Sequence, residues 1–172
     1  MRKFSRSQLN PSNFCGLMIA MILACSFMGR ALAAVVFVCS VSATGINFGL
    51  YNPLNVAATT AAGSWSVNCT ASGTGVGVVS GTLSLSTGSS GTYSSRRLTS
   101  GPNTLNYNIY SSTAYAQIFG DGTGGTYAPS ASGIVIAGQQ YQINGAMYGR
   151  MPPIQDVAPG AYVDLIIVTV TY

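Results

Sequence analysis

The chain has 172 residues, of which 48% are hydrophobic and only 6% are charged, and its formal net charge is +4. This length and apolar content favour one domain with a substantial core and exclude global disorder. The charged fraction is about a quarter of that in an average soluble domain. Four of the seven basic residues precede position 31. The positive charge therefore belongs to the N-terminal segment.

Residues 1–33 have the layout of a secretory signal peptide. Basic residues come first, an apolar run covers 14–28, and Ala31-Leu32-Ala33 forms a small-residue cleavage site. The run of about 15 apolar residues is shorter than the roughly 20 needed to cross a bilayer, so we expect no stable membrane span after cleavage. We predict a signal peptide at 1–33, one domain at 34–172, and export. A competing interpretation makes Cys25 a lipid-acceptor cysteine.

Alternating apolar residues predict a series of β-strands after the signal segment, and no stretch shows a helical period. The expected strands cover 34–41, 64–70, 76–85, 104–110, 139–151 and 161–172. Clusters of Gly, Ser, Thr, Asn and Pro separate them. Strands at this spacing indicate an all-β antiparallel sandwich or barrel.

The last expected strand, 161–172, has two apolar faces. One face holds Tyr162, Asp164, Ile166, Val168, Val170 and Tyr172. The other holds Val163, Leu165, Ile167, Thr169 and Thr171. A strand of this kind is buried on both sides or is open to a further partner.

Residues 34–172 lack the side chains that most catalytic sites need. They contain three arginines, three aspartates, and no Lys, Glu or His, so their formal charge is zero. This composition excludes a Ser-His-Asp triad, a Schiff-base lysine and a histidine metal site. We expect no enzymatic activity, no cofactor, no metal and no nucleic-acid partner.

The two cysteines in this region, Cys39 and Cys69, form an even pair in an exported chain, and we expect them to be bonded. The stretch 120–126 is interpreted as a tight turn rather than as a phosphate or calcium loop, because it has no Lys and one carboxylate. Arg96 and Arg97 are interpreted as a solvated strand end or as a clamp to Asp121 or Asp164.

Several motifs occur in an order that resembles one family. They are Cys39-x-Val41, Asn47-Phe48-Gly49-x-Tyr51-x-Pro53, Val67-x-Cys69, Leu83-x-Leu85, Arg96-Arg97-Leu98, Leu105-x-Tyr107-x-Ile109-Tyr110, Phe119-Gly120-Asp121-Gly122-Thr123, Tyr148-Gly149-Arg150-Met151-Pro152, Gly160-x-Tyr162-x-Asp164 and the end, 168–172. Over 39–172 the chain resembles the spore coat protein U domain family, which includes pilins of archaic chaperone-usher pili. Phe119 stands where the family often has Trp.

The resemblance implies an immunoglobulin-like sandwich that lacks its last strand and is completed by a donor strand. The groove would lie beside the strand 161–172. A periplasmic chaperone would fill it first, and at the outer-membrane usher the N-terminal extension of a neighbouring subunit would replace the chaperone strand. The expected function is that of a pilus subunit at the bacterial surface that contributes to attachment and biofilm formation.

The candidate donor strand is Ala34, Val35, Val36, Phe37 and Val38. Five residues span about 17 Å, which covers only part of a groove, so we expect a minor subunit, an adaptor or tip-proximal, that accepts a strand and donates poorly. Cleavage nearer Cys25 would lengthen this donor. The alternatives are a coat or matrix protein of the same family, and a tip adhesin that binds a glycan or a hydrophobic surface.

Overall fold

The structure is a computed structural model that describes residues 34–172, so the expected signal peptide and Cys25 lie outside the described residues. This part of the chain is all-β. Its strands are β1 (Val36–Thr44), β2 (Thr59–Ser72), β3 (Val76–Leu85), β4 (Arg96–Ser100), β5 (Asn103–Tyr110), β6 (Ser130–Ile136), β7 (Gln140–Met151) and β8 (Val168–Thr171). Two short 3-10 turns, η2 (Gly88–Ser90) and η3 (Thr123–Gly125), interrupt the connections. No helix among these residues is long and apolar enough to cross a membrane.

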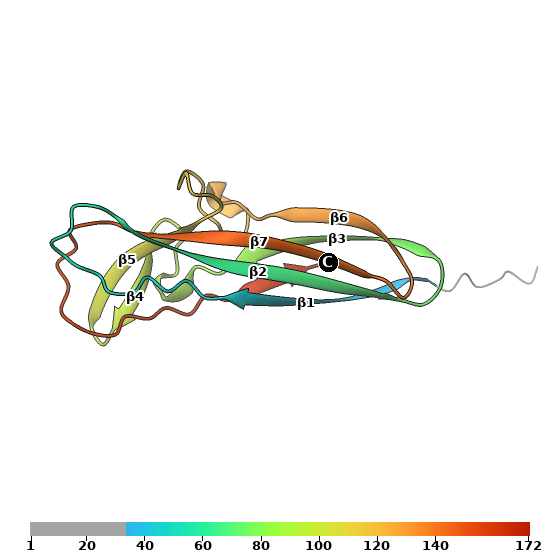
Figure 1. Cartoon of the computed structure of the whole chain (residues 1–172), viewed down its shortest axis with the longest axis horizontal. Helices are drawn as coiled ribbons and strands as arrows, with labels where there is room; N and C mark the ends of the chain where they lie inside the picture. The colour runs from blue at the N-terminus through green and yellow to red at the C-terminus, as the bar shows by residue number, and fades with distance from the viewer. Residues whose placement is uncertain (1–33) are drawn as a thin grey trace, which may run out of the picture. The chain divides into compact units, whose positions relative to one another are not determined.

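The strands form two sheets in which all pairings are antiparallel. One sheet has the order β1-β2-β7-β5-β4, and the other has the order β6-β3-β8 (Figure 1). The long strands β2 and β7 pair over most of their length, and β1 pairs with β2 along its whole length. Both β1 and β8 are therefore edge strands.

This order corresponds to an immunoglobulin-like sandwich with one strand missing. In such domains strands A, B, E and D form one sheet, and C, F and G form the other. Strands β1, β2, β7 and β5 take the places of A, B, E and D, while β3 and β8 take those of C and F. In the described residues no strand follows β8 at the place of G. The fold is thus the expected sandwich, with its final edge position empty.

The core lies between the inner faces of the two sheets, because every second residue of the central strands points inward. On β2 the alternation in 64–70 places Trp65, Val67 and Cys69 inside, as expected. Strand β3 contributes Val79, Leu83 and Leu85. These residues form one continuous buried cluster with side chains of β5 and β7.

The C-terminal strand is shorter than expected. Only Val168–Thr171 pairs with β3, whereas the residues before it cross from one sheet to the other. Val163 forms both backbone hydrogen bonds with Thr99 of β4, at 2.8 and 3.0 Å. A segment that changes sheets cannot be one continuous strand, but its alternation persists: every even-numbered residue from 162 to 170 faces inward and is half-buried.

Two strands were not expected from the sequence. Strand β4 follows a turn-rich stretch and is five residues long, so its alternation is too brief to stand out. Strand β6 begins Ser-Ala-Ser-Gly, which is composed like a turn. Its Gly133 lies under the ring of Tyr141, where a Cβ would collide with the aromatic carbons. The glycine is there for packing rather than for a turn.

Candidate functional site

A disulfide fastens the first edge strand to its sheet. Cys39 and Cys69 stand opposite each other in the β1-β2 register, with Cα atoms 4.0 Å apart, and are bonded. The expected pairing is therefore confirmed. Because both side chains point inward, the bond lies against the core and holds β1 against β2.

The inner faces of the two edge strands are incompletely covered. On β1 the inward side chains Phe37 and Val41 are half-buried, and on β8 the same holds for Val168 and Val170. Their neighbours on β2 and β3 are fully buried. Cα atoms of β1 and β8 come within 8 Å of each other, yet the two strands belong to different sheets. We call these facing edges, with the four half-buried side chains, the open seam.

The segment leading into β8 also exposes apolar side chains on its outer face. Val163, Leu165 and Ile167 are 68%, 79% and 60% exposed. These residues lie just before β8, whose own outward residues are Thr169 and Thr171. The four residues of β8 include no charged residue and no proline, which are among the usual protections of an edge strand. An edge with these properties is a template for an added strand.

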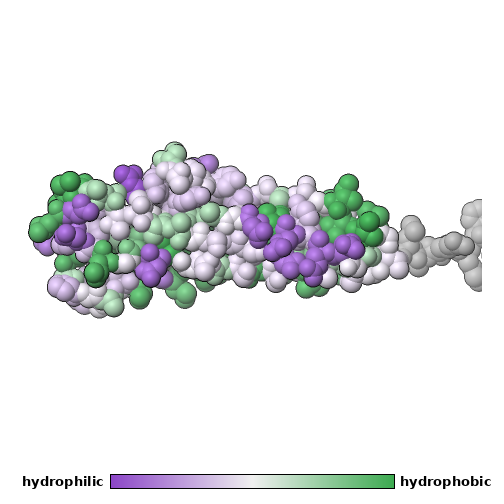
Figure 2. Space-filling model, viewed as in Figure 1, coloured by the Kyte–Doolittle hydropathy of each residue, from purple (hydrophilic) through white to green (hydrophobic). Residues whose placement is uncertain are grey.

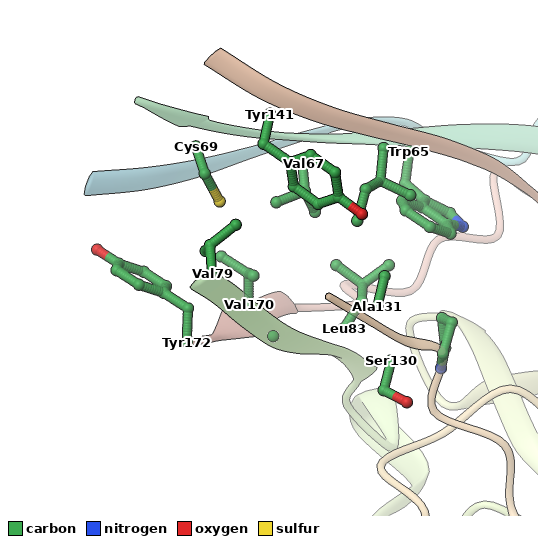
Figure 3. Close-up of a pocket in the computed structure, with 13 residues that line it drawn as sticks. Trp65, Val67, Cys69, Val79, Leu83, Ser130, Ala131, Tyr141, Val170 and Tyr172 are labelled. Atoms are coloured by element: carbon green, nitrogen blue, oxygen red, sulfur yellow. The ribbon is translucent and has the colours of Figure 1, made fainter. Parts of the chain in front are cut away.

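An apolar cavity of about 80 Å³ lies between the sheets near the end of β8. Figure 3 shows Trp65, Val67 and Tyr141 projecting from one sheet toward Val79, Leu83 and Val170 of the other, with Tyr172 at the margin. The cavity is lined almost wholly by carbon. Such a space favours an apolar side chain over water.

A buried arginine, Arg96 of β4, joins the two sheets just beyond the C-terminal end of β3. Arg96 is fully buried, and its guanidinium donates hydrogen bonds to the carbonyl oxygens of Ser86 and Phe119, both at 2.8 Å, and to Asn108 Oδ1 at 2.9 Å. Burial lowers the pKa of Arg96. We call this group the polar anchor. The sequence suggested a clamp to Asp121 or Asp164, but the bonded acceptors are main-chain carbonyls and an amide.

Asp164 lies close to the polar anchor but has its own partners. Its carboxylate accepts hydrogen bonds from the Tyr107 hydroxyl at 2.8 Å and from the Ser89 N–H at 2.9 Å. Burial and the bond to Asp164 raise the pKa of Tyr107 above its usual value, so the phenol remains protonated and donates. The sequence placed Asp164 on the same face as Tyr162 and Ile166 but gave no sign of these partners.

The stretch 120–126 is a turn that its own side chains stabilise, as expected. Asp121 accepts hydrogen bonds from the N–H of Thr123 at 2.9 Å and from the Thr123 hydroxyl at 2.6 Å. These bonds lower the pKa of Asp121. Among the described residues no group of three His, Cys, Asp or Glu side chains is placed to hold a metal ion.

Of the five candidate donor residues, Ala34 and Val35 precede β1, and Val36, Phe37 and Val38 begin it. Val36, Phe37 and Val38 pair with Ser72, Ala71 and Thr70 of the same chain. Val35 and Phe37 also pack over Gly77 of β3, where a Cβ would lie within 3.1 Å of both side chains. In this structure the segment is part of its own domain.

Exposed apolar side chains gather toward the two ends of the sandwich, at the left and right of the view, as the green clusters in Figure 2 show. The connection between β1 and β2 exposes Leu50, Leu54 and Val56 at 99%, 86% and 79%. The outer face of β3 and β6 exposes the cross-strand pairs Val76–Ile136 and Val78–Ile134.

The fold defines the class: an immunoglobulin-like sandwich in which the described residues place no strand beyond β8. The spore coat protein U domain model matches residues 26–169. The chain therefore belongs to the spore coat protein U domain family. Comparison with curated proteins gave no match.

A solved structure with a similar fold is the CsuC-CsuE chaperone-tip adhesion subunit pre-assembly complex from archaic chaperone-usher Csu pili of Acinetobacter baumannii. The TM-score is 0.52 at 18% sequence identity. The alignment covers 80% of this chain and 40% of the matched one. At this identity the likeness establishes the fold, and the chain spans well under half of the matched protein.

Proposed function

We propose that the chain is a structural subunit of an archaic chaperone-usher pilus and that it is completed by a strand from a partner. The observation that carries this proposal is the open seam: two edge strands with half-buried inner faces and no strand beyond β8 in the described residues. Membership in the spore coat protein U domain family and the similarity in fold to a chaperone-bound pilus subunit support it.

The partners follow from the chemistry of the seam. A free strand edge offers backbone hydrogen bonds, and the apolar inner faces offer contacts for alternate side chains of an extended segment. In this proposal a periplasmic chaperone supplies that segment first, an outer-membrane usher receives the subunit, and a neighbouring subunit then replaces the chaperone strand. The route requires export of the chain and ends at the cell surface, where the pilus contributes to attachment and biofilm formation.

We further propose that the chain accepts a strand more readily than it donates one. Residues Val36–Val38 pair with β2, and Phe37 packs against the core. To act as a donor, this segment would have to leave its own sheet. A subunit with this limitation suits a minor position, as an adaptor or near the tip.

Co-purification tests the proposal. The chain is exported together with a tagged chaperone of an archaic chaperone-usher pilus, and the chaperone is recovered from the periplasm. We expect a one-to-one complex. A matched variant, Val170→Asp, places a charge on the inner face of β8 and should lose the complex, whereas Thr169→Asp on the outer face should keep it. Recovery of the chain free of chaperone, with the tagged chaperone present in excess in the same periplasm, would contradict the proposal.

The exposed connection between β1 and β2 supports a second candidate, a tip adhesin. Other residues of this connection pack against the core, as Ile46 and Phe48 do, but Leu50, Leu54 and Val56 are exposed and lie outside the core cluster. The adhesin role predicts that serine at these positions abolishes attachment to hydrophobic surfaces while pilus assembly continues. The other alternative, a coat or matrix protein, requires a self-complete fold, and the open seam favours the pilus subunit over it.

A further inference from the structure

We propose that Asp164 sets the register of β8 against β3 and thereby positions the edge that is offered to a partner strand. The first half of this proposal concerns the chain alone. The second half rests on the proposed function.

The apolar pattern of the segment does not define a single register. A slip by one residue would exchange the two faces, so burial excludes it. A slip by two residues keeps every face. It would only move Ile166, Val168 and Val170 into one another's places, and these side chains differ by one methylene group at most. Registers two residues apart are therefore close in energy as far as this pattern decides.

Asp164 is the charged side chain in this inward-facing series. Its carboxylate accepts the Tyr107 hydroxyl and the Ser89 N–H. It also fits against Gly88, where a Cβ would collide with the carboxylate oxygens. Gly88 has a φ of +68°, which favours glycine for a second reason. The turn at η2 and the strand β5 together form a binding site for one carboxylate.

A slip by two residues would empty this binding site. Ile166 or Tyr162 would move into the place of Asp164, and neither can accept the Tyr107 hydroxyl as a carboxylate does. Tyr107 is buried, so its hydroxyl would lose its acceptor and could not turn to water. The contact with Asp164 therefore penalises the slipped registers.

The other bonds of this segment do not make the same distinction. Ser86 donates its N–H to the Ile167 carbonyl and accepts the Ile167 N–H on its hydroxyl, both at 2.9 Å. Val163 and Thr99 pair through their backbones. Main-chain groups repeat at every second residue, so a shifted strand would form equivalent bonds. The side chain of Asp164 has no such substitute.

The register determines where a partner strand would find its contacts. A slip by two residues moves the free edge of β8 by about 7 Å along its length. The side chains of an added strand would then meet the wrong places in the open seam. Asp164 is thus a positioning residue. It lies shortly before β8 and fixes the position of the free edge of β8 along β3.

The test is NMR on the full exported chain, oxidised and folded. In the native register the Hα atoms of Leu83 and Val170, and those of Leu85 and Val168, give cross-strand contacts, because these residues are opposite each other. Slipped registers give Leu83–Val168 or Leu85–Val170 contacts instead. We expect only the native set in the wild type. In Asp164→Leu the slipped population should rise at least about tenfold, as loss of hydrogen bonds to a charged group implies.

Asp156→Leu is the matched control, because Asp156 is an exposed aspartate outside the strands, and it should keep the native set. Asp164→Asn retains one oxygen acceptor and should give an intermediate shift. If Asp164→Leu does not fold, Asp164→Asn and Tyr107→Phe carry the test. A single native register in all variants that fold would overturn the assignment. Slipped registers in a chain whose wild type never takes up a chaperone strand would uphold the assignment and overturn the pilus function.

Discussion

The C-terminal segment has a closed side, where its contacts are complete, and an open side, where they are not. On the closed side, the buried guanidinium of the polar anchor donates hydrogen bonds to the carbonyls of Ser86 and Phe119. The Asp164 carboxylate accepts hydrogen bonds from Tyr107 and Ser89 on the same side. On the open side, the open seam has half-buried apolar side chains and an unpaired strand edge. Polar groups are hydrogen-bonded on the side where the chain contacts itself, and apolar groups are incompletely covered on the side where we propose that a partner strand binds. The specificity of the fold is concentrated on the closed side.

The largest effect should come from breaking the closed side. Arg96→Ala removes the guanidinium from two carbonyls and from Asn108 Oδ1, which keeps only the Ile109 N–H, and it opens a cavity, so we expect a loss of about 3–5 kcal/mol in unfolding free energy. The matched control Arg97→Ala removes an exposed arginine of the same strand and should change stability by less than about 0.5 kcal/mol. Urea denaturation of the two variants measures the difference. Equal effects would mean that the closed side does not depend on this anchor.

The second-largest loss of stability should come from removing the disulfide that joins β1 to β2. The disulfide closes a separation of 30 residues, so replacing Cys39 and Cys69 together by Ser should cost about 3–4 kcal/mol in the chain-entropy description. Periplasmic yield and protease resistance should fall together. Unchanged yield and resistance would show that β1 stays in place without the bond.

Trimming the seam itself should have a smaller effect on the free chain. Val170→Ala removes two methyl groups from a half-buried position, and we expect about 1 kcal/mol of lost stability. Once a strand has been added, the same position is covered and the loss should grow. Comparing thermal unfolding of the chain alone and in its chaperone complex gives both values. A loss that does not increase in the complex would mean that the seam is not covered there.

The smallest effect belongs to the exposed connection between β1 and β2. Leu50→Ser and Leu54→Ser change side chains that are almost fully exposed, so stability should move by less than about 0.5 kcal/mol. Circular dichroism melts measure this, with Ile46→Ser as a contrasting change because Ile46 packs against the core. A large loss in the leucine variants would show that this connection supports the fold.

The sequence predicted the parts of the molecule that depend on local pattern. Alternation located β3 at its observed bounds and divided the C-terminal segment into its two faces, because the side-chain period of a strand is a local property. The disulfide was predictable from export and from an even pair of cysteines. The family resemblance supplied the vacant strand position.

What escaped prediction depends on contacts between distant residues. Ser89 and Asp164 are 75 positions apart, and the residues around each give no sign of the other. Arg96 was expected at the surface or beside an aspartate, since buried arginines are rare and main-chain carbonyls leave no trace in a sequence. The break in the C-terminal strand at the change of sheets was also invisible, because alternation continues through it.

The disulfide also gives the two walls of the seam different mechanical properties. In the pilus that we propose, a strand seated between β1 and β8 would transmit tension to both of them when the fibre is pulled. The wall at β1 is joined to β2 by a covalent bond, whereas the four residues of β8 are held to β3 by hydrogen bonds and packing. Under load β8 would separate first, so the short last strand would set the force that such a joint withstands.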